Sequence, residues 1–205
     1  MKNLMIWCTC AENNKEHYLH NVEQWYKQVK LLFDEYKPDY LVFVDGTITQ
    51  EEANKPEFAG LTFVCLTPKL GHRGVGRFDG WRRSFKSALE MSRMYNHCLH
   101  IENDVKILHT AKIFEYIEED GFFVGWCKMC GFVETAFMIL NDKDVNERIL
   151  KFYSDERNML GENIPERVVQ EIARQDCKLV FETDRVEGNP NRFNPNYDYV
   201  CQYDV

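Results

Sequence analysis

The sequence of 205 residues has too few basic side chains for a protein that binds nucleic acid mainly through its phosphates. It contains 25 lysines and arginines against 33 aspartates and glutamates, which gives a net charge of −8. A surface that neutralises phosphates carries a basic excess. The charge balance therefore predicts that nucleic acid is not a partner.

Long apolar runs are also missing. No stretch approaches the ~20 apolar residues that a membrane span requires, so we expect no membrane span. The apolar residues 4–7 are too few for the hydrophobic region of a secretory signal, and they are more typical of a buried first strand. Without an export signal, the eight cysteines are expected to be mostly reduced thiols in a cytoplasmic protein.

No internal repeat, low-complexity tract or linker divides the chain, so we expect one domain over residues 1–205. Strand-like apolar runs alternate with stretches of helical periodicity, which predicts an α/β fold. We expect a Rossmann-like, mostly parallel mixed sheet of about six strands, flanked by helices. The strand-like runs cover 4–9, 40–44, 61–66, 98–101, 122–124, 137–140 and 178–182, and the helical stretches cover 16–36, 78–95, 111–117, 144–153 and 165–174.

Ligands of such sheets bind outside the carboxyl ends of the strands. Thr9 and Cys10 follow the first predicted strand, and Asp45 follows the second. Glu102 and Asp104 follow the fourth, and residues i and i+2 of an extended segment project to the same side. Paired carboxylates suit Mg²⁺ or Mn²⁺, although a solvated acidic turn is the alternative interpretation.

A glycine-rich loop at 71–77 precedes the helix predicted over 78–95. Glycines let the backbone approach a ligand, and the start of a helix favours negative charge. The loop is not the Walker pattern. On a helical projection Arg82 borders the apolar face, whereas Arg83 and Lys86 point outward and are expected to be solvated. Arg77 and Arg82 are therefore the candidates for binding a diphosphate.

The stretch GRFDGWRRSFKSALEMSRMYNHCLHIENDVKI resembles the central part of GT-A-type nucleotide-sugar glycosyltransferases. In that family a basic helix start leads to a strand that ends in an acidic D-x-D motif, which binds a metal ion. Glu102, Asn103 and Asp104 form an E-x-D variant of this motif. The resemblance therefore implies Mn²⁺ or Mg²⁺ as cofactor, with Asp104 as ligand and Glu102 as the second candidate.

Two later segments resemble further parts of the same family. GFVETAFMILND is similar to the following strand of retaining members, which places Glu134 at the sugar or the acceptor. GENIPERVVQEIARQDCKLVF is similar to a later acidic helix start, with Glu162 or Glu166 as its acid. Asn163 stands where inverting members carry an aspartate base. The resemblance thus favours retention, with Glu134, Glu162 and Glu166 as the catalytic candidates.

The whole chain resembles the N-terminal domain of a multidomain glycosyltransferase of chlorella viruses. This implies a UDP-sugar donor, a glycan or glycoprotein acceptor, capsid glycan synthesis in the host cytoplasm, and further domains of the same polypeptide. Asp79 would contact the ribose or the donor sugar, or else be a helix N-terminal residue favoured by the helix dipole. The other residues expected at the donor are Thr9, Cys10, Asp45, Arg77, Arg82, Glu102 and Asn103.

Two rival functions fit the same residues. His100 and Glu102, followed by Cys127 and Cys130, match the H-x-E…C-x-x-C pattern of zinc-dependent nucleobase deaminases. The strand before Glu102 and the missing proline before Cys127 argue against that interpretation. The two cysteines could equally be a redox pair or core thiols. The second rival is a non-catalytic sugar- or nucleotide-binding module, because fold does not determine function.

Overall fold

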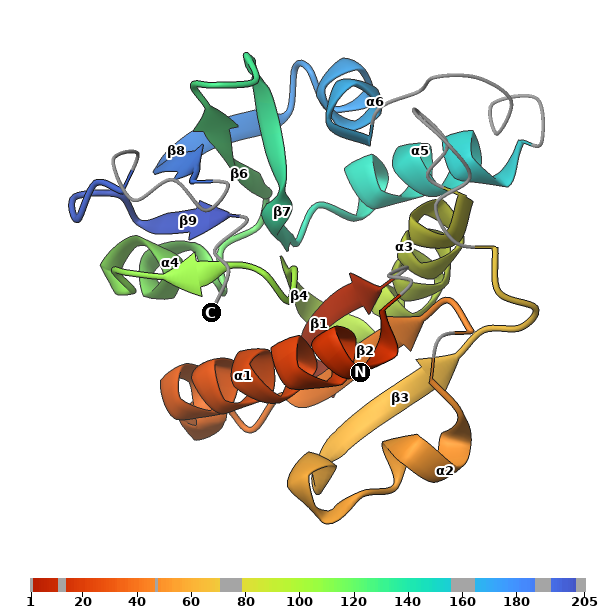
Figure 1. The fold of residues 1–205 in the computed structure, drawn as a ribbon. Helices are drawn as coiled ribbons and strands as arrows, with labels where there is room; N and C mark the ends of the chain where they lie inside the picture. The colour runs from red at the N-terminus through yellow and green to blue at the C-terminus, as the bar shows by residue number, and fades with distance from the viewer. Residues whose placement is uncertain are drawn as a thin grey trace.

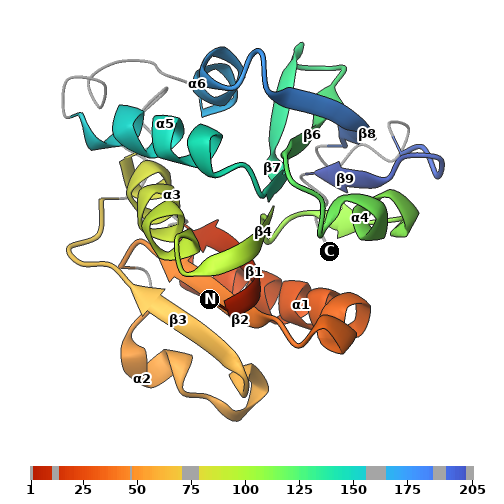
Figure 2. The same cartoon turned by 180° about the vertical axis from the view of Figure 1, so that it is seen from behind.

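One mixed β-sheet runs through the molecule and carries helices on both faces (Figures 1 and 2). The computed structural model describes residues 2–10, 14–46, 48–70, 79–155, 165–186 and 193–201. The strands are β1 (Lys2–Cys10), β2 (Asp39–Val44), β3 (Leu61–Cys65), β4 (Tyr95–Ile101), β5 (Lys106–Ile107), β6 (Phe122–Cys127), β7 (Phe132–Leu140), β8 (Cys177–Arg185) and β9 (Tyr199–Cys201). The helices are α1 (Lys15–Phe33), η1 (Asp34–Tyr36), α2 (Gln50–Ala53), η2 (Pro56–Phe58), α3 (Asp79–Ser92), α4 (Ala111–Tyr116), α5 (Lys143–Ser154) and α6 (Pro165–Ile172).

The strands lie in the order β3-β2-β1-β4-β7-β6-β8-β9-β5. Five neighbouring pairs are parallel, and β4–β7, β6–β7 and β5–β9 are antiparallel. The predicted α/β fold with a mostly parallel mixed sheet is confirmed, but the sheet has nine strands and not about six. The runs that the sequence did not reveal are β5 and β9, which are too short to show an alternating pattern.

Alternation along the central strands divides the core into two layers. In β1, Ile6 and Cys8 pack with α1, whereas Met5 and Trp7 pack with α3. Helix α1 begins where the Asn14 side chain accepts a hydrogen bond from the amide of His17 at 3.3 Å. No helix in the described part of the chain is both long and apolar enough to cross a membrane.

The short connection from β4 to β5 forces the sheet to curl. Residues 102–105 link these strands, yet β5 lies five positions from β4 in the sheet. Five strand spacings of a flat sheet measure about 24 Å, whereas five peptide steps reach at most about 18 Å. The curl brings the far edge back toward β4. Gln28 of α1 fixes the connection, because its side chain bonds the carbonyl of Val105 and the amide of Ile107, both at 3.0 Å.

Gly125 allows β6 to pack closely against β8 and β9. A Cβ atom at this position would lie 2.3 Å from the hydroxyl of Tyr199 and 2.6 Å from Cγ2 of Thr183. Tyr199 is buried and stacks on Phe137 at 4.6 Å, so it has no room to retreat. We therefore expect Gly125→Ala to lower the free energy of unfolding by about 1–3 kcal/mol. Chemical denaturation measures this loss, and an unchanged free energy of unfolding would contradict the close packing at Gly125.

Candidate active site

Glu102 joins three elements at the carboxyl edge of the sheet. Its Oε1 accepts hydrogen bonds of 2.7 Å from the Thr9 hydroxyl, at the end of β1, and of 2.7 Å from the indole N–H of Trp81, in the first turn of α3. The amide of Thr9 donates to Oε2 at 3.3 Å. His100, two residues earlier in β4, places Nε2 3.1 Å from Oε1. The side chain of Glu102 is therefore held in one orientation.

These contacts also determine the charge of Glu102. Burial alone would raise its pKa, but the charge of His100 and the hydrogen bonds from His100, Thr9 and Trp81 bring the pKa below its ordinary value. The buried His100 ring also places Nδ1 3.0 Å from the carbonyl oxygen of Thr135. Glu102 is thus an ionised carboxylate, and its Oε1 already accepts hydrogen bonds from Thr9 and Trp81.

Asp104 has the opposite environment. Burial, together with the negative charges of Glu102 and Glu134, raises its pKa to about 7. Within the described ranges its carboxylate makes no hydrogen bond to another residue's side chain and no ion pair. The charge of Arg185 lowers this pKa only in part. A carboxylate that lies among other carboxylates and forms no ion pair of its own is a suitable ligand for a divalent ion.

The donor set fits a weakly held hard cation better than a tightly held one. Asp104 offers free oxygens and Glu102 offers Oε2. The described residues contain no group of three or more His, Cys, Asp or Glu side chains that could enclose a metal ion. Mg²⁺ and Mn²⁺ are commonly held by one or two carboxylates and complete their shells with water and phosphate oxygens. The residues present therefore fit the predicted cofactor.

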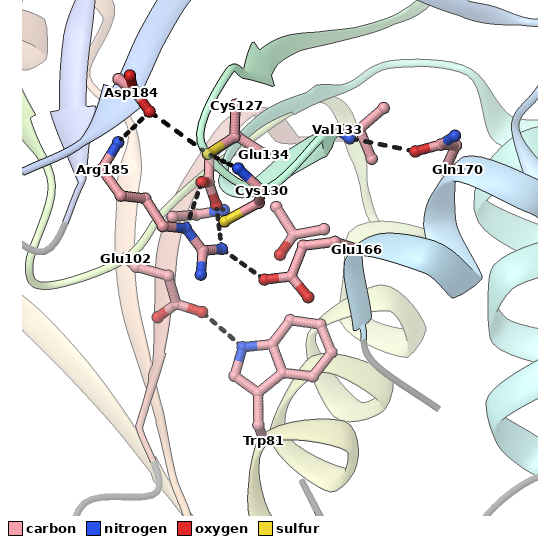
Figure 3. A network of polar contacts seen from close by, with 12 residues as sticks. Trp81, Glu102, Cys127, Cys130, Val133, Glu134, Glu166, Gln170, Asp184 and Arg185 are labelled. Carbon is pink, nitrogen blue, oxygen red and sulfur yellow. Dashed lines mark hydrogen bonds and ion pairs between the residues drawn. The ribbon is translucent and has the colours of Figure 1, made fainter. Parts of the chain in front are cut away.

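Arg185, at the end of β8, holds two other acidic side chains in place (Figure 3). Its Nε lies 2.7 Å from Oε2 of Glu134, and its Nη2 lies 3.0 Å from Oε1 of the same carboxylate. Nη2 also lies 2.5 Å from Oε1 of Glu166, at the start of α6. Glu134 is completely buried, and a buried carboxylate needs such a partner. Although burial alone would lower it, the pKa of Arg185 is raised by these carboxylates, so the residue stays charged.

Two buried oxygen atoms of this region have no hydrogen-bond partner in the part of the chain that the structure describes. They are Oε2 of Glu166 and the hydroxyl of Tyr153, in α5. Burial raises the pKa of Tyr153, the charge of Arg82 lowers it and that of Glu166 raises it, so the three groups lie within electrostatic reach. A ligand that presents hydroxyl groups could satisfy both oxygens.

Asp45, which the sequence predicts at the nucleotide-sugar donor, is fully buried. Its two carboxylate oxygens accept from the amide of Leu70 at 3.1 and 3.0 Å, and Oδ1 also binds the guanidinium of Arg83. The prediction that Arg83 forms a solvated face is wrong. A helical projection of α3 alone does not include β2. Asp45 follows the carboxyl end of β2, and the Arg83 guanidinium reaches this acid. Arg82 is buried, and Asp79 is the first residue of α3.

Some predicted residues cannot be placed. Arg77, Glu162 and the loop at 71–77 lie outside the described residues, as does the side chain of Cys10, although its backbone pairs with Val44. Asn103 lies in the turn beside Asp104, and its buried Nδ2 has no hydrogen-bond partner among the described residues. Sequence reasoning did not identify Trp81 or Arg185 as part of the site. The predicted strand over 178–182 stops three residues before Arg185, whereas β8 continues to Arg185 and carries it to the ligand-binding edge.

The zinc-deaminase pattern is not assembled in three dimensions. His100 lies near the end of β4 and Glu102 directly follows that strand. Cys127 and Cys130 lie at the β6–β7 turn, and β7 separates β4 from β6. The His100 ring packs against Trp7 at 4.1 Å instead. None of the described residues forms a three-ligand cluster.

Removing the indole donor tests the role of Trp81. We expect Trp81→Phe to lower the free energy of unfolding by about 1–2 kcal/mol, because a hydrogen bond to a charged group is lost while the stack on Phe85 at 4.6 Å is kept. Denaturant unfolding measures the loss. The exposed Trp126, changed to Phe, is the control and should unfold like the parent protein. Equal stability of all three proteins would contradict the assignment.

Comparisons with known proteins agree on the fold. No family model and no curated protein matches the sequence. A solved glycosyltransferase involved in the glycosylation of the major capsid of PBCV-1 is similar with a TM-score of 0.58 and 10% identity, over 99% of this chain and 94% of that one. The galactosyltransferase LgtC, in complex with donor and acceptor sugar analogs, gives a TM-score of 0.63 at 9% identity, over 98% of this chain and 87% of that one.

An active-site mutant of LgtC gives the same TM-score of 0.63 at 11% identity, again over 98% of this chain and 87% of that one. At such low identity the likeness concerns the fold. The chain thus has the glycosyltransferase fold that the resemblance of its acidic motif predicted.

Proposed function

We propose that this protein is a glycosyltransferase that moves a sugar from a UDP-sugar donor to a glycan or glycoprotein acceptor and uses Mn²⁺ or Mg²⁺. The observation that carries the proposal is the Asp104 carboxylate, which forms no ion pair among the described residues and lies within electrostatic reach of Glu102 and Glu134 at the ligand-binding edge of the sheet. The fold shared with LgtC and with the PBCV-1 enzyme supports sugar transfer as the reaction.

The leaving group of this reaction is a nucleoside diphosphate, on which negative charge accumulates. When bound by Asp104 and Oε2 of Glu102, the divalent ion would supply the positive charge that stabilises this group. Arg77 and Arg82 are the basic side chains that we assign to the phosphates. Thr9, Asp45 and Asn103, with Cys10, would line the nucleoside side, and Asp79 would face the ribose or the sugar.

The carboxylates held by Arg185 would face the transferred sugar. Oε1 of Glu166 is bound to Arg185, which leaves the buried Oε2 to accept a hydrogen bond from a sugar hydroxyl. Glu134 fixes Arg185 from the opposite side and lies near the acceptor in this proposal. We propose retention of the anomeric configuration, with Glu162 as the further acidic candidate, since the sequence carries Asn163 where a base would be expected.

The likeness to a glycosyltransferase involved in the glycosylation of the major capsid of PBCV-1 supports a role in capsid glycan synthesis. Further domains of the same polypeptide remain part of the proposal. Seven described cysteines are free thiols, which supports a cytoplasmic site of action.

A screen of sugar nucleotides tests the function. The protein is incubated with UDP-, GDP- and CMP-sugars, with Mn²⁺ or with EDTA, and release of the nucleoside diphosphate or monophosphate is measured. We expect hydrolysis of at least one UDP-sugar that is at least tenfold faster with Mn²⁺. Binding of UDP without any turnover on any donor would favour a non-catalytic binding module. Equal rates in EDTA would contradict metal dependence.

A further inference from the structure

The two cysteines of the C-x-x-C motif lie in contact at the turn between β6 and β7. The amide of Cys130 donates to Sγ of Cys127 at 3.4 Å, and the turn is closed by the amide of Gly131, which donates to the carbonyl of Cys127 at 2.9 Å. Besides burial, the neighbouring Cys130 thiol raises the pKa of Cys127, so the two groups lie within interaction distance. Because the Cys130 amide lies in direct contact with the Cys127 sulfur, the backbone brings the two residues close together, as a disulfide with its Cα atoms about 4.4–6.8 Å apart requires.

The surroundings of the two thiols differ. Cys127 is buried, whereas Cys130 is partly exposed and can meet a reagent from solvent. Burial raises the pKa of Cys127 to about 12, so its thiol stays protonated and Cys130 is the thiol that reacts first. Sγ of Cys127 lies 3.7 Å from Oδ1 of Asp184, which can accept the proton of this thiol (Figure 3).

We propose that Cys127 and Cys130 are a reversible redox modification site, and that a peroxide converts them to an intramolecular disulfide. The Cys130 sulfur attacks one peroxide oxygen, which yields a sulfenic acid and releases water. The Cys127 sulfur then attacks the sulfenic sulfur, its proton passes by way of Asp184 to the departing hydroxyl, and a second water leaves. Two thiols and one hydrogen peroxide thus give one disulfide and two waters. A dithiol reductant restores the thiols.

The disulfide would alter the contacts beside Arg185, the residue that binds the carboxylates of Glu134 and Glu166. In the reduced protein Oδ1 of Asp184 accepts from Cys127 and from the amide of Met129 at 3.2 Å. Oxidation removes the thiol donor. Asp184 directly precedes Arg185, whose side chain binds Glu134 and Glu166. Loss of the thiol contact therefore loosens the end of β8 at the residue that holds both carboxylates.

The sequence provides a direct assay, because Lys128 lies between the two cysteines. Trypsin yields peptides 113–128 and 129–143, each with one of these cysteines and no other. After treatment with hydrogen peroxide and alkylation of free thiols, we expect the two peptides to be joined by a disulfide and to separate on reduction with dithiothreitol. Alkylated Cys130 in the unlinked peptide, or Cys130 as sulfinic acid without the link, would overturn the proposal.

A second measurement tests the coupling to Arg185 without using enzyme activity. We expect the oxidised protein to melt about 2–4 °C below the reduced protein. Cys130→Ser, which keeps the Cys127–Asp184 contact, should show no such shift on treatment with peroxide. Cys65→Ser, which removes a partly buried thiol elsewhere, should shift like the parent. Identical melting of the two redox forms of the parent protein would refute the coupling to Arg185, whatever the outcome of the sugar-nucleotide screen.

Discussion

Asp104→Asn is expected to abolish the effect of Mn²⁺ on UDP binding while it makes the metal-free protein more stable. Without the carboxylate, the affinity for UDP in the presence of Mn²⁺ should fall at least tenfold, to the value in EDTA, since the only carboxylate without a partner among Asp104, Glu102 and Glu134 is lost. Titration calorimetry with and without Mn²⁺ measures this change.

The gain in stability should depend on pH. The folded protein raises the pKa of Asp104 from 3.8 to about 7, so ionisation of this group opposes folding. The contribution of Asp104 to the free energy of unfolding is fully present below pH 4, is lost as the pH rises to about 7, and stays lost above that pH. An asparagine does not ionise. In EDTA the variant should therefore match the parent near pH 4 and exceed it by about 1–3 kcal/mol at pH 8, after screening by solvent.

Asp120→Asn is the matched control, because Asp120 is exposed and precedes β6 at the opposite edge of the sheet. It should change neither UDP binding nor the pH profile of stability. If Asp104→Asn keeps the response of UDP binding to Mn²⁺, the assignment of the metal ligand is wrong. If its advantage in stability is the same at pH 4 and pH 8, the raised pKa is wrong.

Arg185→Met should be strongly destabilising, with a loss of about 3–5 kcal/mol of unfolding free energy. The substitution leaves Glu134, which is fully buried, without the guanidinium that binds both of its oxygens. Urea unfolding at pH 7 measures this loss. Arg185→Lys should recover only part of it, because an ammonium cannot form the two parallel bonds of the guanidinium.

A second substitution separates the effect of charge from that of packing. Changing Glu134 to Gln in the Arg185→Met background removes the uncompensated charge and should restore more than half of the lost stability. Arg93→Met is the control, since Arg93 binds Glu147 with two bonds of 2.6 Å on the surface and should matter little. A double variant no more stable than Arg185→Met would show that the ion pair is not the cause.

The sequence allowed the fold class and the ligand-binding edge to be predicted because long strands and amphipathic helices leave periodic patterns. The runs that became β1, β2, β4 and β6 all delivered their carboxyl ends to one edge, with Glu102 and Asp104 among them. The short strands β5 and β9 left no such pattern, since two or three residues cannot show alternation.

The pairing of charges could not be predicted, because it depends on the curl of the sheet. Glu134 and Arg185 are 51 positions apart in the sequence, and nothing in the spacing connects them. Arg83 was assigned to the solvent because its helix was considered alone, whereas β2 presents Asp45 to it. Thr9 and Trp81 donate hydrogen bonds to Glu102 and not to Asp104. This difference depends on the positions of Thr9 and Trp81 in space, which the sequence does not show.

The pairing of β5 with β9 has a consequence for how the protein is made. Lys106 aligns with Val200, and Ile107 aligns with Tyr199. The turn that carries Asp104 is therefore secured on one side by residues synthesised more than ninety positions later. While the ribosome is still translating the intervening chain, the first strands can already associate, but β5, which follows the turn that carries Asp104, still lacks the strand it pairs with. The site can mature only after residue 201 has left the exit tunnel.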